Sequence, residues 1–68
     1  MLTEPPAPED IRAARKAAGL TQPAAGALIH TSTRTWQQWE AGQRNMHAAF
    51  WELFRIKTSS LQTGSKHE

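Results

Sequence analysis

Glycine and proline divide this chain of 68 residues into segments that are all short. Gly19 and Gly42 each follow a run that can be helical, and a glycine in the left-handed conformation is a common end to a helix. Pro8, with two acidic residues directly after it, suits the first turn of a helix. No stretch alternates apolar and polar residues with the period of two that indicates a strand. The sequence therefore predicts an all-α fold made of short helices.

Four helices are expected, near residues 8–18, 22–29, 33–41 and 46–57. Thr21, Ser32 and Asn45 can cap the second, third and fourth of them, because their side-chain oxygens can accept from backbone N–H groups of the first turn. The fourth helix has an apolar stripe that should face the core, made of Met46, Ala49, Phe50 and Leu53. We expect one folded domain at 8–57, between a disordered arm at 1–7 and a disordered polar tail at 58–68.

The composition argues against catalysis and against metal binding. There is no cysteine, which excludes disulfides, thiolate zinc sites and cysteine nucleophiles. The histidines are scattered, carboxylates do not recur at a usable spacing, and no glycine-rich phosphate loop is present. We therefore expect no enzymatic activity, no metal and no cofactor.

Charge and hydropathy suggest the partner and the compartment. Between Asp10 and Lys57 there are seven basic and three acidic residues, an excess of four positive charges. Such an excess suits a polyanionic partner, although many proteins of unrelated function carry one. No apolar run has the length of a membrane span, and the first residues do not resemble a signal peptide. A cytoplasmic protein without a membrane partner is expected.

Two of the expected helices form a unit between Gln22 and Glu40, joined by a short connection centred on His30. This is the helix-turn-helix arrangement. The chain also resembles the Xre/Cro/phage-repressor family over residues 8–57, through these residues: Arg15, Gly19-Leu20-Thr21-Gln22, Ser32 and Trp39-Glu40-x-Gly42. The resemblance implies a four-helix, lambda-repressor-like domain that binds double-stranded DNA. It also implies that Arg15 and Glu40 pair across the first and third helices.

Three further positions predict how the domain packs. Gly26 stands inside the second helix, where glycine costs about 1 kcal/mol relative to alanine, so a close contact should compensate, with the third helix as a candidate. Ala25 is smaller and Trp36 larger than the residues usual at these positions in the family. If both side chains lie in one core, the larger one can fill the space that the smaller one leaves. His30 stands where the family often has a glycine of positive φ, a conformation that histidine tolerates.

The outer face of the third helix is the predicted reading surface. This face lies opposite Trp36 and Trp39 of the same helix. Its members are all polar: Thr33, Arg34, Gln37 and Gln38. In the major groove, arginine can pair with guanine and glutamine with adenine, whereas the alternative is a merely solvated face. Gln22, at the start of the second helix, and Arg44, after the third, are expected on phosphates. Thr35 should contact the DNA backbone or pack inside the protein.

A homodimer is expected because the fourth helix has more apolar surface than one core needs. Trp51 and Phe54 are i, i+3 neighbours on a different side from the predicted stripe, and they should meet their symmetry mates. The alternative is that the arm or the tail covers them. A two-fold dimer would bind an inverted repeat with half-sites about 34 Å apart.

These features together predict a transcriptional regulator. The first hypothesis is a small autorepressor of a phage, prophage or mobile-element operon, with the anti-CRISPR-associated type as one candidate, because so short a chain leaves no room for a sensing domain. The alternative is an antitoxin that also binds a toxin, through its tail or its fourth helix. A pure protein adaptor would instead present a hydrophobic or acidic third helix.

Overall fold

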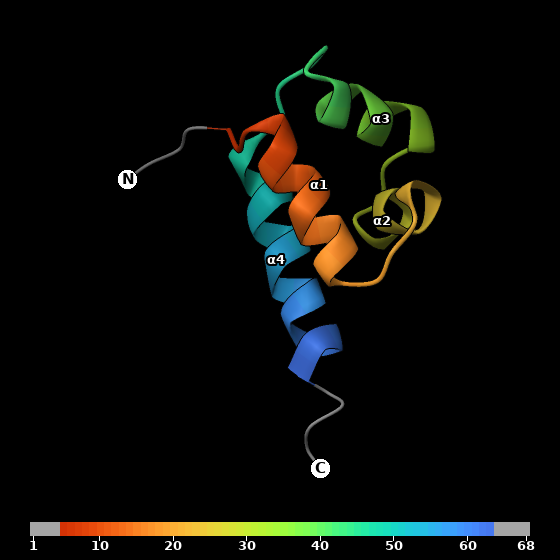
Figure 1. Ribbon diagram of the computed structural model, residues 1–68, viewed down its shortest axis with the longest axis vertical. Coiled ribbons are helices and arrows are strands. Elements are labelled where there is room, and N and C mark those ends of the chain that lie inside the picture. The colour runs from red at the N-terminus through yellow and green to blue at the C-terminus, as the bar shows by residue number, and fades with distance from the viewer. Residues whose placement is uncertain (1–4, 64–68) are drawn as a thin grey trace.

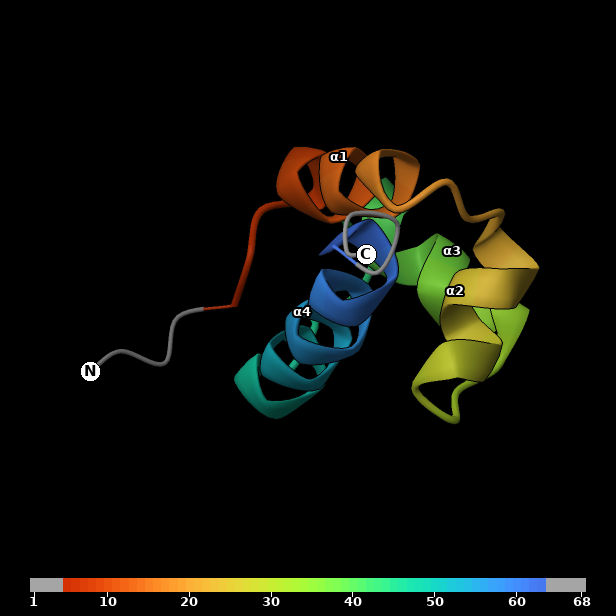
Figure 2. The ribbon, with the colours of Figure 1, turned by 90° about the horizontal axis from the view of Figure 1, so that it is seen from below.

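The computed structural model describes residues 5–63, and side chains as far as Ser59. It contains four helices: α1 (Pro8–Ala17), α2 (Gln22–Leu28), α3 (Thr33–Ala41) and α4 (Ala48–Thr63). These residues include no strand, so the all-α prediction is confirmed. Figures 1 and 2 show α2 and α3 together on one side of the molecule. Within the described chain, no helix is both long and apolar enough to cross a membrane.

The ends of α2 and α3 follow the local signals in the sequence. The Thr21 side chain accepts a hydrogen bond from the Ala24 amide at 3.2 Å, and the Ser32 hydroxyl accepts one from the Thr35 amide at 3.1 Å. Such caps contribute about 1 kcal/mol each. Gly19 and Gly42 have φ angles of 74° and 79°, in the left-handed region that glycine favours. His30 also adopts this region, with φ 63°.

The fourth helix differs from its prediction at both ends. It begins at Ala48, and the His47 Nδ1 atom accepts from the Ala49 amide at 2.9 Å, so His47 caps it and Asn45 does not. It continues to Thr63, so the first part of the predicted tail is helical. Residues 64–68 of that tail, and 1–4 of the predicted arm, lie outside the described residues.

The inward face of α4 also differs from the predicted stripe. Phe54 is completely buried, with its ring centroid 4.9 Å from that of Trp36, whereas Ala49 and Phe50 are exposed. The placement of Phe54 in a dimer interface is therefore wrong. The predicted stripe begins at Met46, but Met46 precedes α4 and enters the core from the loop before that helix. Thr58, one turn after Phe54, is buried too, and its hydroxyl donates to the Phe54 carbonyl at 2.8 Å.

Trp36 occupies the centre of the core. Its ring meets that of Trp39 edge-on, with centroids 5.6 Å apart. Ala25 is fully buried as well, so the expected pairing of one small and one large residue in a single core is present. The core draws on all four helices and the loop before α4: Ile11, Ala25, Ile29, Trp36, Trp39, Met46 and Phe54. Lys57 adds a polar link, because its ammonium group donates to the Leu28 carbonyl at the end of α2, at 3.0 Å.

Gly26 makes the expected close contact, but with the turn that leads into α3. A β-carbon at Gly26 would lie 3.0 Å from the Thr31 carbonyl oxygen and 3.1 Å from that of Ser32. Both are backbone atoms, so no side-chain rotation can relieve the clash. The absence of a side chain at Gly26 thus allows α2 to approach the turn closely.

Gly26→Ala is expected to lower the free energy of unfolding by about 1 to 3 kcal/mol, as inserting a methyl group into a packed site does. The loss should appear although alanine is the better helix former by about 1 kcal/mol. Thermal unfolding followed by circular dichroism measures it. Ala27→Gly, at an exposed position of the same helix, gives the cost of helix propensity alone. A Gly26→Ala protein more stable than the wild type would contradict the close contact.

Candidate nucleic-acid interface

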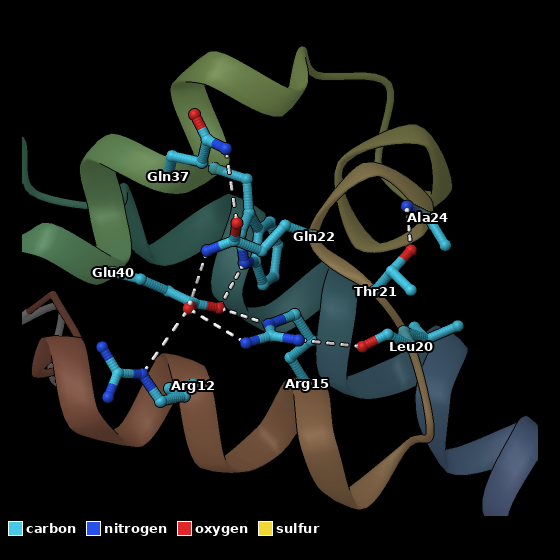
Figure 3. Close-up of polar contacts among 9 residues, drawn as sticks. Arg12, Arg15, Leu20, Thr21, Gln22, Ala24, Gln37 and Glu40 are labelled. Atoms are coloured by element: carbon cyan, nitrogen blue, oxygen red, sulfur yellow. Dashed lines mark hydrogen bonds and ion pairs between the residues drawn. The ribbon is translucent and has the colours of Figure 1, made fainter.

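A carboxylate joins α1 to α3 beneath the outer face of α3. Arg15 donates to Glu40 twice, from Nε to Oε2 at 2.6 Å and from Nη2 to Oε1 at 3.2 Å. Its Nη1 atom donates to the Leu20 carbonyl at 3.0 Å, in the loop before α2 (Figure 3). The pairing implied by the family resemblance is therefore present. It is bidentate, which fixes the relative orientation of the two helices.

Two neutral donors complete the surroundings of Glu40, whose side chain is 3% exposed. The Trp36 indole donates to Oε2 from one turn earlier on α3, and the Gln22 amide nitrogen donates to Oε1 at 3.1 Å. Arg12 adds an outer contact at 3.7 Å, from a side chain that is 58% exposed. With Arg15, these groups use the acceptor positions that an ionised carboxylate offers.

The charge of Glu40 is favoured by this environment. Burial would raise the pKa of the carboxyl, but the hydrogen bonds from Arg15, Trp36 and Gln22, together with the Arg15 charge, outweigh it. The pKa of Glu40 is therefore lowered from its ordinary value. The group stays ionised and accepts hydrogen bonds without donating any.

Gln22 connects this carboxylate to the surface. Its amide oxygen accepts from Gln37 Nε2 at 3.4 Å, while its nitrogen faces Glu40 (Figure 3). The sequence predicts a phosphate contact for Gln22. In the structure, both ends of its amide group are engaged with α3.

The outer face of α3 carries the four residues predicted to read bases. Arg34 and Gln37 are exposed, and Thr33 and Gln38 are partly buried. Trp36, Trp39 and Glu40 are buried on the opposite side. A shallow hollow runs along the outer face, lined by Arg34, Gln37, Gln38, Ala41 and Gln43. The structure therefore brings the predicted reading residues together on one surface.

Arg44 and Thr35 were also predicted to contact the DNA backbone, and the structure holds their side chains to different degrees. Arg44 is exposed in the loop after α3, and no hydrogen bond or ion pair holds its side chain within the described chain. Thr35 is partly buried, and its hydroxyl accepts from Ser32 Oγ at 2.9 Å, so it takes part in the cap of α3. Of the alternatives open for Thr35, the structure favours a role inside the protein.

Two residues of this region were not predicted from the sequence. Gln43 lines the hollow, and its position directly after the helix-ending Gly42 was a usable signal. The Trp36 indole donates to Glu40, and a buried tryptophan needs such an acceptor, which the carboxylate four residues later could supply. In the described part of the chain, no three His, Asp or Glu side chains are gathered so that they could hold a metal ion.

Comparison with known proteins agrees with this geometry. The helix-turn-helix domain family matches residues 9–54, from α1 into α4. The Type II methyltransferase M.MspI of a Moraxella species is 40% identical over 50 residues, which are 74% of this chain. The chain spans 12% of the length of that enzyme, so the similarity concerns a segment of it. From the match over α1–α4, and the two helices and turn that it contains, the chain belongs to the helix-turn-helix domain family of DNA-binding proteins.

Proposed function

We propose that this protein is a sequence-specific transcriptional regulator of the Xre/Cro/phage-repressor type, which lays α3 in the major groove. One observation carries the proposal: the exposed side of α3 consists of hydrogen-bonding side chains around Arg34 and Gln37, and its other side forms the core. A helix with that division can enter the groove without disturbing the fold. Binding of DNA without chemical change to it is part of the proposal, so the methyltransferase activity of the relative is not carried over.

Base reading is assigned to the outer face of α3. Arg34 has five N–H donors and is suited to the two acceptors of guanine, O6 and N7. Gln37 and Gln38 each carry a donor and an acceptor, the combination that adenine requires. Thr33 stands in the first turn of α3, the part of a recognition helix that meets base edges.

Arg44 is proposed as a phosphate contact beside the groove. Arg44→Ala should weaken binding to operator and random DNA alike, and should lower the slope of log K against log salt by about one, because one fewer counterion is released. Affinities measured at four or five salt concentrations give that slope. Arg55→Ala removes the same charge from α4 and should leave the slope unchanged. A change of base preference in Arg44→Ala would place this residue in the groove.

A two-fold homodimer on an inverted repeat remains part of the proposal, with a changed interface. Phe54 belongs to the core, so the large apolar side chains exposed on α4 are Ile56, which is 62% exposed, and Phe50, which is 39% exposed. Trp51 on the same helix is partly buried. Sedimentation of the protein, free and on operator DNA, tests this proposal. A monomer in both states at micromolar concentration would remove it.

For the cellular role, we propose a cytoplasmic autorepressor of a phage, prophage or mobile-element operon, of which the anti-CRISPR-associated operons are one kind. The alternative, an antitoxin, would bind a small toxin as well as its operator. Purification of a tagged chain from its host distinguishes the two, because a toxin would co-purify with an antitoxin.

Selection of bound sequences from a random DNA pool tests the proposed function itself. We expect an enriched site with two related half-sites, one helical turn apart. A pool that shows no enrichment, although the protein is folded, would contradict sequence-specific binding.

A further inference from the structure

We propose that the hollow on α3 binds the 5-methyl group of a pyrimidine, packed against the side chain of Ala41. Thymine carries this group, and so does cytosine after methylation at C5. The inference rests on the proposed function and adds an apolar group to the hydrogen-bonding groups that α3 would read. It arises from the composition of the hollow, where one exposed methyl group lies among polar side chains.

The walls of the hollow come from α3 and from the residue that follows its end. Arg34 and Gln38 lie seven and three residues before Ala41, so the three share one side of the helix. Beyond Gly42, whose φ is 79°, the Gln43 amide donates to the Gln38 carbonyl at 2.9 Å. The chain therefore turns back against the last turn of α3, and Gln43 lines the hollow together with Ala41.

Ala41 is the apolar member of the hollow. Four of the five lining side chains end in a guanidinium or an amide group, whereas Ala41 ends in a methyl group. Ala41 is exposed and is not among the residues of the hydrophobic core, so its methyl group is available to a ligand. The hollow has a volume of about 320 Å³, roughly ten times that of a water molecule in the liquid. It can therefore take the edge of a base.

The base edges in the major groove offer one kind of apolar group. All four bases present hydrogen-bond donors or acceptors there, and thymine adds its C5-methyl group. A donor or acceptor placed on Ala41 would lose its water without gaining a partner. A methyl group placed there removes apolar surface of both partners from water, which favours binding by about fourfold. In 5-methylcytosine, the methyl group is attached to the same ring carbon as in thymine.

The test measures the effect of the methyl group on DNA that differs in nothing else. In an operator selected from a random pool, each thymine is replaced singly by uracil, which lacks the methyl group but forms the same base pair. Each cytosine is replaced singly by 5-methylcytosine, and fluorescence anisotropy gives the affinities. We expect one position in each half-site where the methyl group strengthens binding about threefold to fivefold. A loss with uracil identifies thymine as the source, and a gain with 5-methylcytosine identifies methylated cytosine.

Substitution of Ala41 assigns the effect to the hollow. Ala41→Gly removes the methyl group of the protein, and Ala41→Asn replaces it with an amide group. In both variants the effect of the DNA methyl group should disappear at that position, while the preference at positions read by Arg34 remains. Ala17→Gly is the matched control, because Ala17 is also exposed and is also the last residue of a helix, α1. This control should keep the full effect of the methyl group.

The possible failures are distinguishable. If the methyl effect persists in both Ala41 variants, it acts through the shape of the DNA and the proposal is overturned. An equal loss of affinity for all sequences in these variants, with the methyl effect unchanged, would make Ala41 a site of close approach to the DNA backbone, which also overturns it. A selected operator without any methyl effect contradicts the methyl site and leaves the proposed function intact. A random pool without enrichment contradicts the proposed function, and the methyl site with it.

Discussion

Glu40→Ala is expected to lower the free energy of unfolding by about 3 to 5 kcal/mol, the usual cost of removing one partner of a buried ion pair. Arg15 would keep its charge at the boundary of the core, and the Trp36 indole and the Gln22 amide would lose their acceptor. A domain of this size has a total stability on the order of 3 to 10 kcal/mol. Urea titration followed by circular dichroism should therefore show a variant that is largely unfolded at 37 °C.

Glu52→Ala is the matched control, an exposed carboxylate on α4 whose loss should change stability by about 0.5 kcal/mol or less. The pH dependence provides a second measurement. Because the folded protein holds the pKa of Glu40 below its ordinary value, the stabilisation from its charge is complete above that ordinary value and is lost as the pH falls through the lowered one. The gap in stability between the wild type and Glu40→Gln should therefore narrow on acidification. A constant gap would mean that the charge is unimportant.

Arg34→Ala is expected to abolish operator recognition without affecting the fold. One bidentate contact to guanine contributes about 1 to 3 kcal/mol of discrimination, and a symmetric dimer loses two such contacts. Specific binding should thus fall by about 30-fold or more, while binding to random DNA changes far less. Fluorescence anisotropy with operator and scrambled duplexes measures both affinities.

Two controls separate the loss of a base contact from the loss of charge. Arg34→Lys keeps the positive charge but not the planar guanidinium group. Its affinity for random DNA should therefore be close to that of the wild type, whereas its discrimination between operator and random DNA should stay low. Arg55→Ala removes an arginine from α4 and should leave discrimination intact. If Arg34→Ala keeps the spectrum of the wild type and still discriminates as well, α3 is not the recognition helix.

Much of the fold was predictable because its signals are local. Thr21 and Ser32 accept from amide groups three residues later, and Gly19 and Gly42 adopt positive φ, all within one turn of a helix end. Such signals depend on neighbours in sequence, and tertiary packing left them unchanged. The polar outer face of α3 was visible for the same reason, because helical spacing alone separates it from the tryptophans.

Local signals of this kind do not determine which side of α4 faces the core. Several apolar stripes are possible along 46–58, and the correct one depends on where the helix begins. The start lies at Ala48 because His47 caps the helix, and histidine is not among the usual capping residues. A predicted start at Met46, two residues earlier, selected the stripe that begins with Met46 as the buried face of the helix. Phe54 does not belong to that stripe, so it was predicted to lie at the surface.

The candidate site was predicted residue by residue but not as a connected set. Arg15 and Glu40 were paired through the family resemblance, and Gln22 and Gln37 were assigned separately to the DNA. Their connection depends on how α1 and α2 meet α3, which places donors from positions 15, 22 and 36 around one carboxylate. Side chains far apart in sequence converge there, and no local pattern encodes that convergence.

The contact at Gly26 bears on how such proteins diversify. The direction in which α3 leaves the turn is set by a glycine against two backbone carbonyl groups, and no side chain of the outer face contributes to that contact. Residues such as Arg34 can therefore be exchanged during evolution while α3 keeps its place. Under the proposed function, related chains could acquire new DNA sites through single substitutions, and a gene duplication could give two proteins that no longer compete for the same site. Gln37 has less of this freedom, since its replacement also removes a partner of Gln22.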